Sequence, residues 1–167
     1  MNMRIGKVID CAIEYLGNDA RRINHFMKVH GFAKTIGELE HLPEKDQEIL
    51  EVTAVLHDIG IKLAEEKYNS SAGNYQELEG PAVAEGMLKE LGYGQEFIER
   101  VKFLIGHHHT YTNIEGMDYQ ILVEADFIVN IYEDGMEEEA AKKVLEKIFR
   151  TSAGTKLMKN MYIKEEI

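Results

Sequence analysis

Apolar residues recur at intervals of three and four along most of the chain. In the segment MRIGKVIDCAIEYLG, residues 3–17, six apolar positions follow this spacing: Ile5, Val8, Ile9, Ala12, Ile13 and Leu16. Such spacing places the apolar side chains on one face of an α-helix, and the glycine that ends the segment is a common helix terminator. No segment shows the convincing alternation of a half-buried strand. The sequence therefore predicts an all-α fold.

The same spacing predicts a bundle of about six to eight helices. Asp19 can cap a helix over 20–39, and Pro43 can open another that runs to the pair His57 and Asp58. Further helices are expected from Gly80 and Pro81 to about Gly92, over about 95–108, over 117–135 and over 137–149, and the tail can add a short one. The segment 65–80 is rich in Ser, Gly and Asn and is expected to be the one long loop, a feature that is often functional in compact domains.

Composition favours a globular protein of the cytoplasm. With 167 residues, of which 44% are hydrophobic, residues 1–167 are expected to form a single domain with one core. Cys11 is the only cysteine, and neither a secretory leader nor an apolar run of membrane-spanning length is evident. A net charge of -11 disfavours broad binding to nucleic acid or to anionic lipid. A phosphorylated ligand must then be held by local cations or by a metal ion, and a homo-oligomer is compatible with the sequence.

Candidate chemistry begins in the segment AVLHDIGIK, residues 54–62, where His57 and Asp58 follow a run of apolar residues. An ionisable pair in that position costs free energy unless a partner compensates it. Helical offsets point three further side chains toward the same interior: His25 among Val29, Phe32 and Ile36, His108 after Val101, Leu104 and Ile105, and Asp126 among Leu122, Val123 and Val129.

Each of these side chains also has an ordinary structural interpretation. His25 can be a hydrogen-bonded core histidine, and Asp58 can cap a turn. Asp126 can pair with Arg22 or a lysine, and the triple histidine 107–109 can be a solvated helix end. The joint pattern favours a different interpretation, because four helices each point a ligand-type side chain inward. Together these side chains would satisfy a divalent ion.

Four segments in a fixed order resemble the HD-domain metal-dependent phosphohydrolases of the HDIG type. They are RRINHFMKV, LHDIG, LIGHHH and VEADFIVN, and the resemblance runs from about Asp19 to Asp134. It implies an all-helical bundle that hydrolyses phosphoesters, often those of nucleotides. It also implies a set of metal ligands: His25, His57, Asp58 and Asp126.

Two imidazoles and two carboxylates suit a divalent ion such as Mn, Fe, Co, Ni, Zn or Mg, which can activate a water molecule and offset charge on phosphoryl oxygens. Asp58 can orient or deprotonate that water if one of its oxygens stays free of the metal. Lys62 lies one helical turn after the His57–Asp58 pair and Arg22 three residues before His25, so both are candidates for holding the substrate phosphate. Solvated surface cations are at least as plausible an interpretation of either residue.

A second metal ion is expected to be weak or absent. Bimetallic relatives carry a further histidine before a glycine-containing helix start, and the matching segment here, YQELEGPA, offers Gln76, Glu77 and Glu79. We expect one tightly held ion, with a second dependent on Glu79 or on substrate. His107 and His108 are expected to act as phosphate contacts or proton donors. The absence of a GYP signature after HHHTYTNIEG argues against a cyclic-dinucleotide substrate.

These observations predict a phosphohydrolase that cleaves a phosphomonoester or phosphodiester in a small, nucleotide-like substrate. The alternatives are a metal-containing module that senses a nucleotide or phosphate without turnover, and a bundle in which the metal is only a structural staple. An open coordination position lined by Lys62, Arg22 or the segment 65–80 would favour the enzyme, and a closed site would favour the sensor.

Overall fold

A computed structural model describes residues 4–164, and within this range the chain forms nine α-helices and no strand. The helices are α1 (Arg4–Leu16), α2 (Ala20–Leu39), α3 (Glu44–Leu56), α4 (Ile61–Tyr68), α5 (Gly73–Glu90), α6 (Gln95–Ile105), α7 (Met117–Glu133), α8 (Glu138–Ile148) and α9 (Ser152–Tyr162). The predicted all-α class is confirmed. None of the helices in this range has the length and apolar character needed to cross a membrane.

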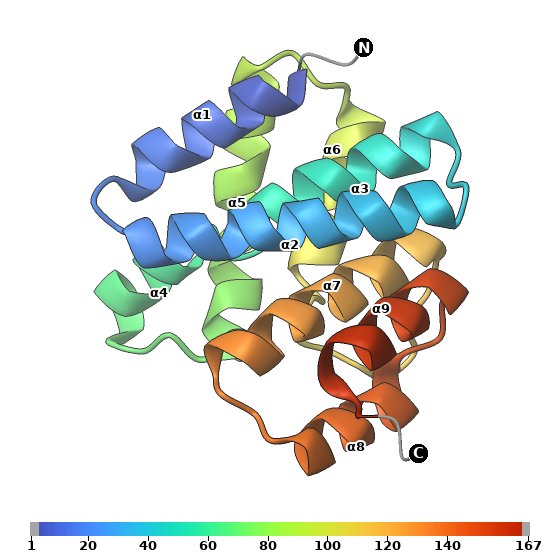
Figure 1. Cartoon of the computed structure of the whole chain (residues 1–167). Helices are drawn as coiled ribbons and strands as arrows, with labels where there is room; N and C mark the ends of the chain where they lie inside the picture. Colours follow the sequence, from blue (N-terminus) through green and yellow to red (C-terminus); the bar gives the residue numbers. More distant parts are fainter. Residues whose placement is uncertain (1–3, 165–167) are drawn as a thin grey trace.

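Helices α2, α3 and α7 form the centre of the bundle, with α2 packed along both of the others (Figure 1). Helices α5 and α6 pack together, and α6 and α1 lie against α3. Helices α8 and α9 cover another side of α7. Eleven residues of α7 are buried, because neighbours surround most of this helix. A polar residue on α7 is therefore carried into the core, where it needs a partner.

The segment 65–80 is not a loop, so this prediction was wrong. Helix α4 ends at Tyr68 and α5 begins at Gly73, which leaves only residues 69–72 between them. Pro81 therefore lies inside α5 instead of opening it. An internal proline removes one backbone hydrogen bond, but packing against neighbouring helices can offset that cost. The additional helix α4 raises the number of helices from the expected six to eight to nine within the described residues.

Gly60 and Gly80 let the turn after α3 lie directly against α5. A Cβ atom at Gly60 would lie 2.5 Å from the backbone nitrogen of Gly80 and 2.7 Å from the carbonyl oxygen of Gln76. A Cβ atom at Gly80 would lie 2.6 Å from Cγ2 of Ile105. Larger side chains would force these backbones apart. The contact therefore fixes the turn that follows Leu56 beside the first half of α5.

Helix α6 ends at Ile105, three residues before the predicted end. His107, His108 and His109 consequently lie in the turn that follows the helix. Successive side chains in a turn leave the backbone in different directions, so these three histidines have different surroundings. Only the structure determines which of them faces the interior.

Candidate metal centre

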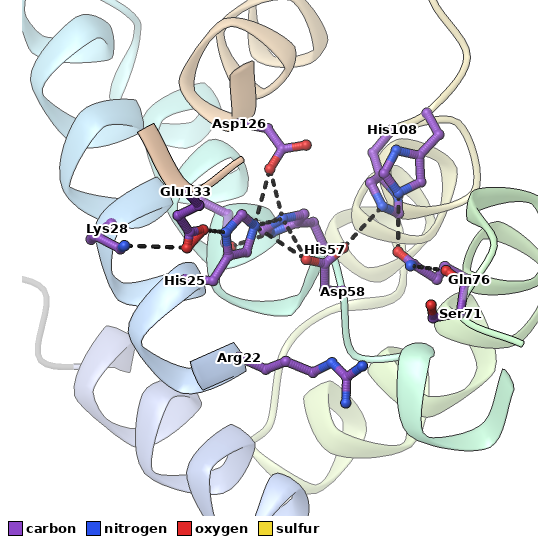
Figure 2. A network of polar contacts seen from close by, with 12 residues as sticks. Arg22, His25, Lys28, His57, Asp58, Ser71, Gln76, His108, Asp126 and Glu133 are labelled. Atoms are coloured by element: carbon purple, nitrogen blue, oxygen red, sulfur yellow. Dashed lines mark hydrogen bonds and ion pairs between the residues drawn. The ribbon is translucent and has the colours of Figure 1, made fainter. Parts of the chain in front are cut away.

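Four side chains from two helices and the turn after α3 converge in the core (Figure 2). His25 comes from α2, His57 follows the end of α3, Asp58 lies in the next turn and Asp126 lies in α7. The Nε2 atom of His25 is 3.2 Å from Asp58 Oδ2 and 3.1 Å from Asp126 Oδ1. The Nε2 atom of His57 is 3.2 Å and 3.3 Å from the same two oxygens. Both imidazoles therefore face the same pair of carboxylates.

Hydrogen bonds on the opposite ring nitrogens fix the direction of the imidazoles. Nδ1 of the fully buried His57 donates to the carbonyl oxygen of Ala54 at 2.7 Å. Nδ1 of His25 forms a short contact with Oε1 of Glu133. Carbonyl and carboxylate oxygens only accept hydrogen bonds, so Nδ1 carries the proton in each ring. The Nε2 lone pair of each neutral imidazole then points into the cluster.

This arrangement fits a divalent cation. The Nε2 atoms of His25 and His57 are 3.3 Å apart, and two lone pairs at that distance repel each other unless a proton or a cation lies between them. One ligand atom from each of His25, His57 and Asp58 lies within 4.8 Å of the others. A buried set of imidazole nitrogen and carboxylate oxygen atoms is typical of sites for first-row transition metals. Asp126, on α7, adds a second carboxylate to this set of ligands.

In the metal-free protein, protons on the imidazoles balance the carboxylates. Burial opposes protonation of His25, but hydrogen bonds to Asp126 and Asp58 outweigh it and raise the pKa of His25 to about 10. Burial likewise opposes a charge on His57, yet the nearby Asp58 carboxylate raises its pKa well above the ordinary value. Burial would raise the pKa of both carboxylic acids, but the adjacent histidines lower the pKa of Asp58 and that of Asp126. The cluster therefore stabilises positive charge at its centre.

His108 lies on the other side of Asp58. Its side chain is buried, and its Nδ1 atom donates to the carbonyl oxygen of Ile105 at 2.6 Å. Its Nε2 atom is 3.3 Å from Asp58 Oδ1 but lacks hydrogen-bond geometry, and it has no other partner within residues 4–164. A buried nitrogen without a partner indicates a place for a proton, a water molecule or a cation.

His109 belongs to the site although it was not predicted. It forms a second group of potential ligands with Asp58 and His108, and its Nε2 atom is 3.0 Å from Oε1 of Gln76. Burial and the neighbouring His108 lower the pKa of His109 to about 4. The third histidine of the HHH run was a visible signal, but its direction depends on the turn after α6.

Three residues proposed from the sequence do not reach the cluster. Nζ of Lys62 donates to the carbonyl oxygen of Tyr15 at 3.1 Å and lies over the Tyr15 ring, because α4 presents this side chain toward α1. The His107 ring stacks on Phe103 with its Nδ1 atom 2.7 Å from the Phe103 carbonyl oxygen. Glu79 accepts hydrogen bonds from two residues of α4, at 3.0 Å and 2.8 Å, namely Lys67 and Tyr68. We assign none of these three a role in the site.

An open cavity of about 540 Å³ borders the cluster. Arg22 lines it, and its guanidinium group pairs with Asp19 at 2.7 Å and with Glu65 at 2.5 Å. Gln76 also lines it, and its Nε2 atom donates to the carbonyl oxygen of Ser71 at 2.6 Å. The structure therefore places Arg22 and Gln76, both proposed from the sequence, beside the cluster.

Glu133 is a further residue that sequence reasoning missed. Its Oε2 atom accepts from Nζ of Lys28 at 3.2 Å, while Oε1 contacts His25 (Figure 2). Glu133 lies seven residues after Asp126, a spacing that places both on one face of α7. That periodicity was available from the sequence, but the partner of Glu133 was not.

Comparison with known proteins agrees with this geometry. A model of the HD domain family matches residues 22–151. A crystal structure of a predicted HD superfamily hydrolase from an uncultured Thermotogales bacterium is similar over 93% of this chain and 82% of that chain, with a TM-score of 0.63 and 23% sequence identity. At this level of identity the likeness concerns the fold alone. No curated protein matches the sequence.

Proposed function

Because the chain belongs to the HD-domain family, we propose that it is a metal-dependent phosphohydrolase that cleaves a phosphomonoester or phosphodiester of a small molecule. The observation that carries this proposal is the convergence of His25, His57, Asp58 and Asp126 beside an open cavity. A structural staple would need the same ligands but no cavity. A cavity that reaches the ligands favours an ion accessible to a substrate.

Different residues of the cluster would bind the metal ion and accept the proton of the attacking water molecule. A divalent ion held by the four ligands would supply bound hydroxide and offset charge on the phosphoryl oxygens. Asp58 presents Oδ2 to His25 and His57 and Oδ1 to His108. The second oxygen, which lies 3.3 Å from Nε2 of His108, is therefore placed to accept a proton from an attacking water molecule.

Arg22 is the cation best placed to contact the phosphoryl group. Its guanidinium group lines the cavity, and its ion pairs with Asp19 and Glu65 hold it there. A planar guanidinium binds two phosphoryl oxygens at once, which favours one orientation of the substrate. The sequence had made both Arg22 and Lys62 candidates for holding the substrate phosphate, and we now propose this role for Arg22 alone.

A covalent mechanism through Cys11 is not supported. Cys11 lies on α1 and lines a separate surface depression with Tyr15 and Glu90. Burial and the nearby Glu90 raise the pKa of its thiol, which lowers the fraction present as thiolate. Water activated at the cluster is the better nucleophile.

Metal analysis followed by an activity panel tests the proposal. Purified protein should contain a divalent metal and should hydrolyse p-nitrophenyl phosphate or bis-p-nitrophenyl phosphate in the presence of Mn²⁺, Co²⁺, Ni²⁺ or Mg²⁺. The matched Asp126→Asn variant should lose both metal and turnover. Metal-loaded protein that binds phosphate compounds without cleaving any would contradict the hydrolase and support a sensor.

The family resemblance also implies a nucleotide-like substrate. The metal cluster does not distinguish one phosphorylated alcohol from another, because it contacts only the phosphoryl group. The identity of the alcohol depends on the wall of the cavity.

A further inference from the structure

Polar and charged residues make up most of the lining of the cavity beside the metal cluster. Ile61 is the one aliphatic residue among the described residues that line it, and the only rings there are the imidazoles of His25 and His109. Pockets for aromatic ligands are usually lined by apolar and aromatic side chains. The edge of a nucleobase could form hydrogen bonds in this cavity, but its two apolar faces would displace water from charged groups without gaining apolar contacts.

An aromatic side chain close to the cluster does not change this conclusion. Tyr111 lies near Asp126. Burial and the charge of Asp126 together raise the pKa of the Tyr111 hydroxyl to about 12. Its ring packs against Phe127, with the centroids 5.1 Å apart, and it does not line the cavity. A base therefore finds no phenyl, phenol or indole ring on which to stack within the wall, and the two imidazoles there belong to the groups of potential metal ligands.

The charge of the wall limits the number of phosphoryl groups. Five carboxylates and two guanidinium groups line the cavity: Asp19, Asp58, Asp126, Glu133 and Asp134, with Arg21 and Arg22. Arg22 is already shared between Asp19 and Glu65. Even with a divalent ion bound and the lining histidines neutral, negative charges outnumber positive ones. A single phosphoryl group can be held at the ion, whereas a di- or triphosphate would bring further anionic groups against carboxylates.

Helix α7 and Asp134, the residue that follows it, present three polar groups in a row along the cavity. Asp126, Asn130 and Asp134 are spaced by four residues, so they share a face of the helix. A rise of about 1.5 Å per residue places Asn130 about 6 Å and Asp134 about 12 Å from Asp126 along the axis. Neither the Asn130 nor the Asp134 side chain forms a hydrogen bond or ion pair within residues 4–164. Both are therefore available to a ligand.

Amide and carboxylate groups are the usual partners of hydroxyl groups. The Asn130 amide both donates and accepts, and the Asp134 carboxylate accepts from up to two hydroxyls. A row of such groups that begins at the metal site matches a molecule with one phosphoryl end and several hydroxyls. Glu133 also lines the cavity, but its carboxylate already contacts His25 and Lys28 and is not free to bind a substrate hydroxyl.

Resting on the proposed hydrolase activity, we infer that the substrate is the monophosphate of a small hydroxyl-rich alcohol, such as a sugar or a polyol, and not a nucleotide. The phosphoryl group lies at the metal cluster beside Arg22. The hydroxyl-bearing body extends along α7 toward Asn130 and Asp134.

A substrate panel with Mn²⁺ tests this inference. Sugar and polyol monophosphates are compared with nucleoside 5′-mono-, di- and triphosphates, and p-nitrophenyl phosphate serves as the reference for basal activity. We expect kcat/KM to be at least about tenfold higher for the best sugar or polyol phosphate than for any nucleotide, the effect of one or two hydrogen bonds. Binding is checked separately by calorimetry of the metal-loaded protein with phosphonate analogues of the best compound in each class. The sugar or polyol analogue should bind more tightly.

Variants on α7 locate the interaction. Asp134→Ala and Asn130→Ala should each lower kcat/KM for the best sugar or polyol phosphate about tenfold more than they lower it for p-nitrophenyl phosphate. Asp134 is exposed at the end of the helix, so its replacement should not unfold the protein. The control is Glu139→Ala, which removes an exposed carboxylate from α8 and should change neither value.

The two proposals fail in different ways. If p-nitrophenyl phosphate and every other ester remain intact in metal-loaded protein, the hydrolase proposal is wrong and this inference falls with it. If p-nitrophenyl phosphate is cleaved but nucleotides are the better substrates, the hydrolase stands and the sugar or polyol assignment is overturned.

Discussion

Asp126 and Glu133 lie two turns apart on α7 and contact opposite nitrogens of the same imidazole. Asp126 Oδ1 is 3.1 Å from Nε2 of His25, and Glu133 forms its short contact with Nδ1. One face of a single buried helix therefore holds His25 from both sides. The orientation of this histidine depends on α7 as much as on its own helix, α2.

Asp126→Asn should remove most of the bound metal and lower the melting temperature. The ligands come from α2, from the turn after α3 and from α7, so a bound ion links these three parts of the chain and stabilises the fold. At a free metal concentration one hundred times the Kd, this linkage contributes about 2.7 kcal/mol. Metal analysis and thermal unfolding with and without Mn²⁺ measure both effects, and Glu139→Gln is the surface control. An unchanged metal content in Asp126→Asn would remove Asp126 from the ligand set.

Glu133→Gln should weaken metal binding by about 10- to 100-fold while the four ligands remain in place. A carboxylate on Nδ1 fixes the proton there and makes Nε2 of His25 a stronger donor to the metal, and loss of such a partner typically has an effect of this size. Metal titration by calorimetry measures it. Glu133→Asp should fall between the wild type and Glu133→Gln, whereas a purely structural role would lower the melting temperature without changing the metal affinity.

His108→Ala should reduce turnover about 100-fold and reduce metal content far less. His108 faces the second oxygen of Asp58, which remains free when the first oxygen binds the ion. Steady-state kinetics and metal analysis of the same preparation separate the two effects. His107→Ala is the matched control, because the His107 ring stacks on Phe103 away from the cluster.

A metal titration of the His108→Ala variant also decides how many ions bind. Two equally tight ions per wild-type chain, with one of them lost in this variant, would overturn the expectation of one tightly held metal. His108, His109 and Asp58 would then be the ligands of the second ion.

Metal affinity should rise as the pH rises from about 6.5 toward 10. In the metal-free protein the pKa of His25 is raised from 6.5 to about 10, so a proton must leave before the ion can bind. The raised pKa of His25 also stabilises the fold of the metal-free protein. This stabilisation is fully present below pH 6.5 and is lost as the pH rises through about 10, the pKa of His25 in the folded protein. The melting temperature of metal-free protein should therefore fall over this range. Calorimetry in buffers of different ionisation enthalpy would reveal the released protons.

Chelation should abolish hydrolysis, and Cys11→Ser should leave it unchanged. The mechanism uses water at the metal cluster and no protein nucleophile. Assays before and after dialysis against a strong chelator, with metal content measured in parallel, test the first statement. Full turnover in protein shown to be free of metal would refute the mechanism.

The sequence alone determined the helical class and the inward direction of the main candidate ligands. His25 and Asp126 each lie on an apolar helix face, and helix periodicity depends only on neighbours three and four residues away. The order of the four motif segments also sufficed for the family, which the family model confirms over residues 22–151. These features are local, so they can be identified from the sequence without knowledge of packing.

The tertiary structure decided which side chains meet. Lys62 and Glu79 were placed near the site by their distance along the chain. In the folded chain α4 packs against α5, where Glu79 pairs with Lys67, and Lys62 contacts Tyr15 of α1. The segment 65–80 became mostly helix, because contacts with neighbouring helices outweigh the turn preference of Ser, Gly and Asn. Contacts between distant segments set the rotation of each helix about its axis and the exit direction of each turn. His109 and Glu133 entered the site for that reason, since both positions depend on packing across the bundle.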